Sequence, residues 1–252
     1  MPARLRLATV TCALLLGAAD PGARADDDPR LALMRSRWPG TVITYGFPEA
    51  GFRWKRAATP AASWAAGFLP ANGQEKMLYR RALGEWAAAS GGAVRFVETA
   101  PEKAQLRLAV TTASMGTLPN GTPYRGWTFL PGSGARAGET WLQVGLRALG
   151  YADGQRGGWV IRHEVGHALG LKHPHEGSPR LPVALDCAPH TVMTYRTYCG
   201  DPRPDGWPDG LPSYPHALGN LDGAAVRLLY AAPAASVAAW SAAGRGMSNG
   251  EE

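Results

Sequence analysis

The 252-residue sequence has few cysteines, few lysines and no long run of one charge. It contains three cysteines, and only four of its 26 basic residues are lysine. The formal net charge is +6, but the basic residues are scattered and not interleaved with aromatics, so nucleic-acid binding is not indicated. No apolar stretch reaches transmembrane length, so we expect no membrane span. The sequence also lacks internal repeats, including the glycine-aspartate nonapeptides of a calcium-binding β-roll.

The first 25 residues have the pattern of a secretory signal peptide. Arg4 and Arg6 precede an apolar stretch over residues 7–19, and Ala25 ends a small-x-small cleavage site. The apolar stretch is too short to cross a bilayer as a stable helix. Cys12 lies inside this stretch, in a poor context for lipidation. We therefore expect an exported protein, either secreted or periplasmic.

The stretch HEVGHALGLKH, which begins at His163, predicts a metal site. His163 and His167 are four residues apart, so on a helix they project from one face and can hold one zinc ion. Glu164 can then reach a metal-bound water as a general base. Gly170 lets the chain leave the helix, because glycine tolerates positive φ, and His173 follows as a third ligand. Three imidazoles and a water are the open coordination of a catalytic zinc.

Two other interpretations of this stretch are possible. His175 lies two residues further on and could compete as the third ligand, although the longer motif favours His173. A bare HExxH can also occur on an ordinary helix whose histidines are only hydrogen-bonded. The added Gly170 and His173 argue against that alternative.

Cys187 and Cys199 would remain after removal of the signal peptide. In an exported protein such a pair is predicted to form a disulfide, with two buried thiols as the alternative. Closing a loop of this size would stabilise the fold by about 3 kcal/mol on the chain-entropy model.

Hydrophobic spacing predicts an α/β (α+β) fold. We expect strands over residues 41–47, 93–97, 106–111, 124–130 and 139–144, and helices over 73–90, about 157–169 and about 219–230. Strand, helix and two strands in that order suggest a mixed sheet with a crossover helix. Residues 174–217 are rich in Pro, Gly and Asp without periodicity, so this region is predicted to be loop-rich and either stapled or functional.

The histidine motif resembles that of the metzincin metallopeptidases, and a second segment agrees with it. The sequence TVMTY, Thr191 to Tyr195, looks like the Met-turn, in which a methionine, here Met193, forms an apolar base beneath the zinc. The plain alternative for Met193 is a core methionine. Tyr195 matches the pattern of serralysins and astacins, where this tyrosine can bind zinc at rest and swing away to stabilise the transition state. Asp222 falls where the family places an aspartate bonded to the Met-turn backbone, or is only a charge near a helix N-terminus.

The resemblance covers about residues 40–230 and is closest to the serralysin-like catalytic domain. It implies a zincin-like fold: a twisted five-stranded mixed sheet with an antiparallel edge strand, a zinc helix, and a loop-rich C-terminal subdomain ending in a helix. A peptide substrate is expected to pair with the edge strand, whose residues are Arg125, Gly126, Trp127, Thr128 and Phe129. The expected divisions are a signal peptide (1–25), a short lead (26–39), a catalytic domain (40–230, with lobes 40–172 and 173–230) and a flexible tail (231–252).

The sequence departs from its relatives in three respects. Typical serralysins carry a calcium β-roll and no N-terminal signal, whereas here a signal is predicted and the roll repeats are absent. Structural calcium is possible but not indicated. The cysteine switch of the matrixins is also missing, because no cysteine lies between Asp26 and the zinc helix.

Motif and resemblance together imply a secreted, monomeric zinc endopeptidase with one catalytic zinc ion and a peptide or protein substrate. Glu164 would act as the general base, and Tyr195 would stabilise the oxyanion. One alternative is a zinc hydrolase acting on another amide, such as a cell-wall peptide. The other is a non-catalytic zinc-binding interaction module, which Glu164 argues against because a structural site has no use for a base.

Overall fold

The computed structural model of the chain describes residues 28–54 and 61–231. The predicted signal peptide lies outside these residues, as does the predicted flexible tail apart from Ala231. Among the residues described, no helix is long and apolar enough to cross a membrane.

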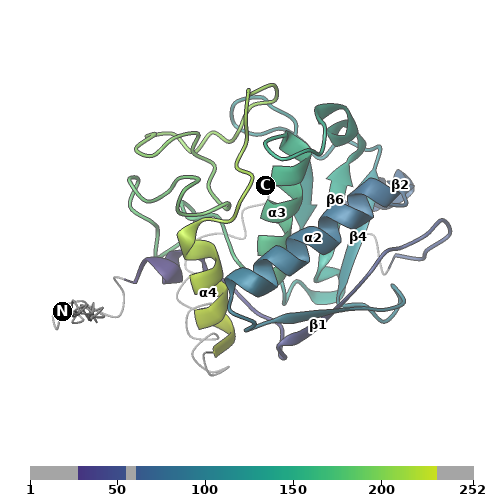
Figure 1. Ribbon diagram of the computed structural model, residues 1–252. Helices are drawn as coiled ribbons and strands as arrows, with labels where there is room; N and C mark the ends of the chain where they lie inside the picture. The colour runs from purple at the N-terminus through teal and green to yellow at the C-terminus, as the bar shows by residue number, and fades with distance from the viewer. Residues whose placement is uncertain (1–27, 55–60, 232–252) are drawn as a thin grey trace, which may run out of the picture.

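A six-stranded mixed sheet forms the centre of the molecule (Figure 1). Five strands lie in the order β3-β1-β4-β6-β5, with the bounds Val42–Gly46 (β1), Arg95–Glu98 (β3), Leu106–Thr111 (β4), Gly126–Thr128 (β5) and Glu139–Gln143 (β6). Strands β3, β1, β4 and β6 run parallel, whereas β5 runs antiparallel to β6 at one edge. The predicted mixed sheet and the direction of its edge strand are confirmed.

The predicted number of five strands was wrong, because a sixth strand pairs with β4. Strand β2, Phe68–Leu69, lies antiparallel to the end of β4. β1 pairs only with the start of β4, at Leu106 and Arg107, so the rest of this edge is open to β2. A strand of two residues carries no alternation of apolar and polar side chains, and the sequence pattern therefore did not reveal it.

Helices α2 and α3 pack on one face of the sheet. The helices of the described residues are α1 (Ala61–Ala66), α2 (Gly73–Ala89), α3 (Arg156–Leu169) and α4 (Asn220–Ala231), with short 3-10 helices η2 (Pro29–Leu33), η3 (Gly134–Arg136) and η4 (Val144–Leu149). The last three α-helices match predicted helices, whereas the six-residue α1 was not foreseen. Fully buried Leu106 and Leu108 of β4 belong to one core with Leu83 and Trp86 of α2 and Val165 of α3. Helices α2 and α3 contact each other, and each also contacts the sheet, α2 at β3 and α3 at β5 and β6.

Aromatic side chains cover the opposite face of the sheet. They form a second cluster that includes Trp54, Trp64, Phe68, Trp127, Phe129 and Trp141. Along β5, Trp127 joins this cluster, whereas Thr128 lies on the α3 side and is bonded to Glu164. Alternate side chains of a strand point to opposite faces, so β5 is held from both sides.

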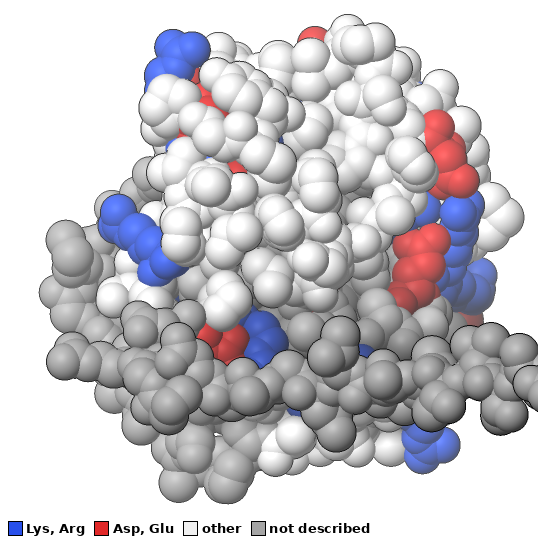
Figure 2. All heavy atoms as spheres, turned by 60° about the vertical axis from the view of Figure 1, so that its left-hand side comes forward, with Lys and Arg blue, Asp and Glu red and all other residues white. Residues whose placement is uncertain are grey.

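The described chain between α3 and α4 contains no helix, and its only β pairing is the single bridge at Leu171. This agrees with the predicted loop-rich region. These loops occupy the upper left of Figure 1. On the face that Figure 2 brings forward, charged residues are few, mixed in sign and set in a largely uncharged surface. This face carries no extended patch of one charge.

The segment before β1 pairs with the chain that follows α3. Met34 forms an isolated antiparallel bridge with Leu171, and the backbone N–H of Lys172 donates to Leu33 O (2.8 Å). The backbone N–H of Arg35 donates to Gly170 O (3.0 Å). The described part of the predicted lead is therefore built into the fold, directly beside the turn that leads to His173.

Candidate metal centre

Three histidines converge at the end of α3. His163 and His167 project from one face of the helix, and their Nε2 atoms are 3.1 Å apart. Gly170 ends the helix with a φ of +100°, which a residue with a Cβ rarely adopts. The chain then turns back and places His173 Nε2 3.2 Å from that of His163 and 3.0 Å from that of His167.

The other ring nitrogen of each histidine fixes its tautomer. His163 Nδ1 donates to Val192 O (2.9 Å), and His167 Nδ1 donates to Leu171 O (2.8 Å), because a carbonyl oxygen can only accept. His173 Nδ1 donates to the carboxylate of Glu176 (2.6 Å). Burial lowers the pKa of all three imidazoles, that of His167 to about 3, so they are neutral.

Three Nε2 atoms without protons therefore lie close together and cannot hydrogen-bond to one another. A metal ion bound to all three would make this arrangement favourable. Tetrahedral zinc with Zn–N distances near 2.0–2.1 Å requires nitrogens separated by about 3.3 Å. The observed separations of 3.0–3.2 Å fit such an ion closely.

His175 lies beside this group and not within it. Its ring stacks on His173 with centroids 5.5 Å apart and planes 6° apart. Of the two candidate third ligands, His173 is the one that the structure brings to His163 and His167. His175 instead groups with His173 and Glu176 on the outer side.

Glu164 is buried between α3 and β5. Its Oε2 accepts a hydrogen bond from Thr128 Oγ1 (2.7 Å). Burial raises its pKa to about 8, against the lowering effect of Thr128. A dication on the histidines would lower this pKa again, because it favours the charged carboxylate.

Gly126 allows the close approach of β5 to Glu164. A Cβ at this position would lie 2.5 Å from Glu164 Oε1 and 2.8 Å from Val160 Cγ1. Gly126 and Thr128 were predicted only as part of an edge strand that binds substrate. Their contacts with Glu164 were not foreseen, because no local sequence pattern reports a contact between residues so far apart in the chain.

The predicted Met-turn residues lie against the histidines. Met193 is fully buried and packs on Gly166, in the helical turn between His163 and His167. The ring of Tyr195 lies 4.1 Å from that of His173, centroid to centroid. Met193 and Tyr195 therefore both lie next to the histidines of the candidate centre.

Asp222 connects α4 to this centre through the backbone. Its carboxylate accepts hydrogen bonds from Thr191 Oγ1 (2.6 Å), Val192 N (2.8 Å) and Gly219 N (2.7 Å). The carbonyl of the same Val192 accepts from His163 Nδ1. A displaced Asp222 would therefore disturb the orientation of a histidine that it does not touch.

Replacing Asp222 by alanine is expected to lower the free energy of unfolding by about 2–4 kcal/mol, because it leaves buried donors unpaired. Asp222→Asn is the matched control, since its amide oxygen still accepts from the two backbone N–H groups. Urea denaturation should therefore show a much smaller loss for this variant than for Asp222→Ala. Equal losses would contradict the hydrogen-bonding role.

The stability difference between the wild type and Asp222→Asn is expected to depend on pH. Burial raises the pKa of Asp222 to about 6, above that of an unfolded aspartate. The protonated form therefore favours folding, and this part of the stability falls as the pH rises from about 4 to about 6. Asp222→Asn should lack that part of the pH dependence.

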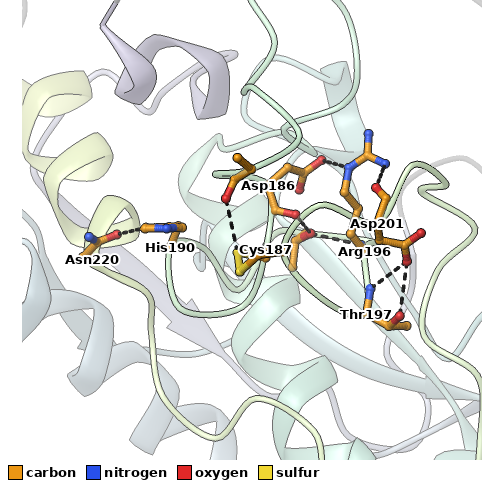
Figure 3. The surroundings of a disulfide bond; sticks show 10 residues. Asp186, Cys187, His190, Arg196, Thr197, Asp201 and Asn220 are labelled. Carbon is orange, nitrogen blue, oxygen red and sulfur yellow. Dashed lines mark hydrogen bonds and ion pairs between the residues drawn. A yellow bond between two sulfur atoms is a disulfide. The ribbon is translucent and has the colours of Figure 1, made fainter.

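A disulfide joins Cys187 to Cys199 on either side of Met193 and Tyr195, so the predicted bridge is confirmed. Figure 3 shows a second crosslink beside it, in which Arg196 Nε donates to the buried carboxylate of Asp186 (2.8 Å). Arg196 also donates to Asp201 O, and Asp201 accepts from Thr197. Covalent and ionic links thus hold a loop that has no regular secondary structure.

Reduction of the disulfide should lower thermal stability and any hydrolytic activity together. The expected loss of stability is about 3 kcal/mol for a loop of this size. Zinc affinity should fall less, because the three histidines lie outside the bridged segment. Thiol titration of the denatured, unreduced protein should find neither Cys187 nor Cys199 free, and two titratable thiols at these positions would refute the bridge.

Strand β5 forms the central part of the predicted substrate strand. It lies at the end of the sheet, and among the residues described no other strand pairs with its outer edge. The backbone groups of Arg125 and Phe129 bond to β6, and the alternation of an antiparallel ladder points those of Gly126 and Thr128 outward. The side chain of Arg125 is bonded to Gln143 (3.0 Å) and to Asp209 (2.6 Å). It therefore links the strand to the C-terminal loops.

Comparison with known proteins finds a weak similarity. The chain is 29% identical to serralysin A of Dickeya chrysanthemi over 166 residues and 29% identical to serralysin C of the same organism over 169 residues. Each match covers 63% of this chain and 34% of the relative, so the chain spans about a third of the length of these proteins. No protein-family model matches the chain. The similarity supports a distant, metzincin-like relation.

Proposed function

We propose that the chain is a zinc-dependent endopeptidase and that His163, His167 and His173 hold one zinc ion. The convergence of three unprotonated Nε2 atoms beside a buried carboxylate carries this proposal. Bound there, zinc would supply Lewis acidity to a peptide carbonyl and to the attacking water. The distant similarity to the serralysins points to the same class of reaction.

Glu164 is the general base of the proposed reaction. Thr128 holds Oε2, which leaves Oε1 as the oxygen that faces the water. Near a dication the carboxylate is ionised at neutral pH, so it takes a proton from the water during attack. It then delivers this proton to the nitrogen of the leaving amine.

Tyr195 and β5 position the substrate. The Tyr195 hydroxyl donates to the oxyanion that forms on the attacked carbonyl, a bond made only in the transition state. The substrate lies as an added strand along the open edge of β5 and bonds to the outward backbone groups of Gly126 and Thr128. Met193 supports the histidines from below by packing on α3.

The protein acts outside the cytoplasm in this proposal. A disulfide such as Cys187–Cys199 persists in an oxidising compartment. The predicted signal peptide would deliver the chain there.

Hydrolysis of unfolded casein tests the proposal. Purified protein should cleave casein, lose activity with 1,10-phenanthroline and regain it with added zinc. Metal analysis should find one zinc ion per chain before chelation. Undiminished activity after measured loss of zinc would contradict the proposal, and bound zinc without cleavage would favour the non-catalytic module.

A further inference from the structure

A small cavity lies against Glu164, between β5 and the first turns of α3. Its volume is about 30 Å³, and its lining includes Leu118, Gly126, Trp159, Glu164, Tyr195 and Trp207. A larger hollow of about 380 Å³, lined by Trp54, Arg107 and Glu139, touches none of these residues. Of these two, the small cavity lies beside the proposed reacting atoms, since its lining includes Glu164 and His163.

Large aromatic side chains close the base of this cavity. The ring of Trp159 lies 5.5 Å from that of Trp207 and 6.1 Å from that of Tyr214, centroid to centroid. The buried Arg156 guanidinium lies 5.5–5.6 Å from the Trp159 and Tyr214 rings. Arg156, Trp159 and Trp207 line the cavity, and Tyr214 packs against Trp159 and Trp207 behind them.

Asp209 fixes the two sides of the cavity relative to each other. Its carboxylate forms ion pairs with Arg156 at the start of α3 (2.9 Å) and with Arg125 beside β5 (2.6 Å). Arg156 also donates to the carbonyl oxygens of Trp207 and Pro208. These contacts link β5, α3 and the loop that carries Asp209, so widening the cavity would break partly buried ion pairs.

Leu118 closes the remaining side from the loop between β4 and β5. It is almost fully buried and packs on Gly206, in the segment that follows Tyr195. Asn120 Nδ2 donates to Gly206 O (3.1 Å), and Gly206 N donates to Tyr195 O (3.1 Å). The two loops therefore meet beside the proposed oxyanion-stabilising residue.

We propose that this cavity receives the side chain of one of the two residues that flank the scissile bond, and that Leu118 limits this residue to glycine, alanine or serine. The inference rests on the proposed peptidase function. A volume of about 30 Å³ holds about two water molecules, which matches a methyl or hydroxymethyl group and excludes a leucine or phenylalanine side chain.

Cut-site mapping with a peptide library tests the inference. The wild-type protein is incubated with the library, and the residues on both sides of each cut are read by mass spectrometry. Matched quenched peptides that differ only at the selected position then give kcat/KM values. We expect alanine to be preferred over leucine by at least about 10-fold, the discrimination that steric exclusion of a few methylenes gives.

Leu118→Ala should widen the cavity without altering the histidines or Glu164. It should raise kcat/KM for the leucine peptide at least 10-fold and change the alanine peptide less than threefold. Leu149→Ala is the control, because Leu149 is a partly buried leucine that does not line the cavity. Its alanine-to-leucine ratio should equal that of the wild type.

The wild-type measurement alone can overturn the inference, whether or not Leu118→Ala folds. Cleavage with leucine or phenylalanine at both flanking positions, within threefold of alanine, would contradict the size limit and leave the peptidase function standing. An unchanged ratio in folded Leu118→Ala would reject Leu118 as the limiting residue. Failure to cut any peptide with zinc bound would contradict the peptidase function itself.

Discussion

Replacement of Glu164 by alanine is expected to lower kcat for peptide hydrolysis by about 10²–10⁴-fold or more, while zinc remains bound. Glu164 is next to a histidine of the triad but is not one of the three converging nitrogens, so its loss should spare the metal. Its Oε2 is bonded to Thr128, and its Oε1 lies against Gly126 of β5, so its carboxylate is held in one position beside the triad. Casein cleavage and zinc content measured on the same preparation give the result.

Glu102→Ala is the matched control for this variant. Glu102 is an exposed glutamate in the turn before β4, outside the candidate centre. Its removal should leave both kcat and zinc content unchanged. More than about a tenth of wild-type activity in Glu164→Ala would exclude Glu164 as the general base.

Tyr195→Phe should lower kcat by about 10²–10³-fold, with little change in KM. The loss corresponds to one oxyanion donor, roughly 2.7–4 kcal/mol. Since the hydroxyl is proposed to act only in the transition state, the effect belongs in kcat. Zinc content should stay at one per chain, because the aromatic ring beside His173 is kept.

Tyr198→Phe provides the comparison for Tyr195→Phe. Tyr198 is three residues away in the same disulfide-bridged segment, but its side chain is 61% exposed. We expect wild-type kinetics for this control. If Tyr195→Phe also matched the wild type, its hydroxyl would have no part in the reaction and the ring would serve packing alone.

The sequence predicted the elements whose signals are local. Helical spacing indicated α2, α3 and α4, and the positions of His163, His167 and His173 relative to Gly170 indicated that they would meet. The single pair of cysteines left after the signal region indicated the bridge. The helices and the histidine motif depend on residues close together in the sequence. The disulfide follows because only two cysteines remain to pair.

Contacts between distant segments were not predictable in the same way. Thr128 reaches Glu164 across 36 residues, and Arg125 reaches Asp209 across 84. Both pairings depend on how the loops pack, which no periodicity encodes. The same limit applies to β2, since two residues pair with β4 only because β1 ends early.

Glu176 is a further residue whose role the sequence did not suggest. Its carboxylate accepts the Nδ1 proton of His173 at 2.6 Å, where the other two histidines use backbone carbonyls. Of the three groups that accept a bond from the Nδ1 atoms, the carboxylate of Glu176 is therefore the one that a side-chain substitution can remove. It lies three positions after His173, and the turn in which Glu176 N donates to His173 O (3.2 Å) brings the two side chains together.

The bridge between Met34 and Leu171 has a consequence for the order in which the protein folds. Met34 pairs with a residue 137 positions later in the chain, so this first segment has no partner until the chain after α3 is in place. Long-range contacts of this kind form slowly, because the loop between them must close first. The turn that leads to His173 therefore depends on this early segment. A chain that lacks residues 28–36 would lose these backbone bonds, and we expect it to bind a metal ion less tightly at the three histidines.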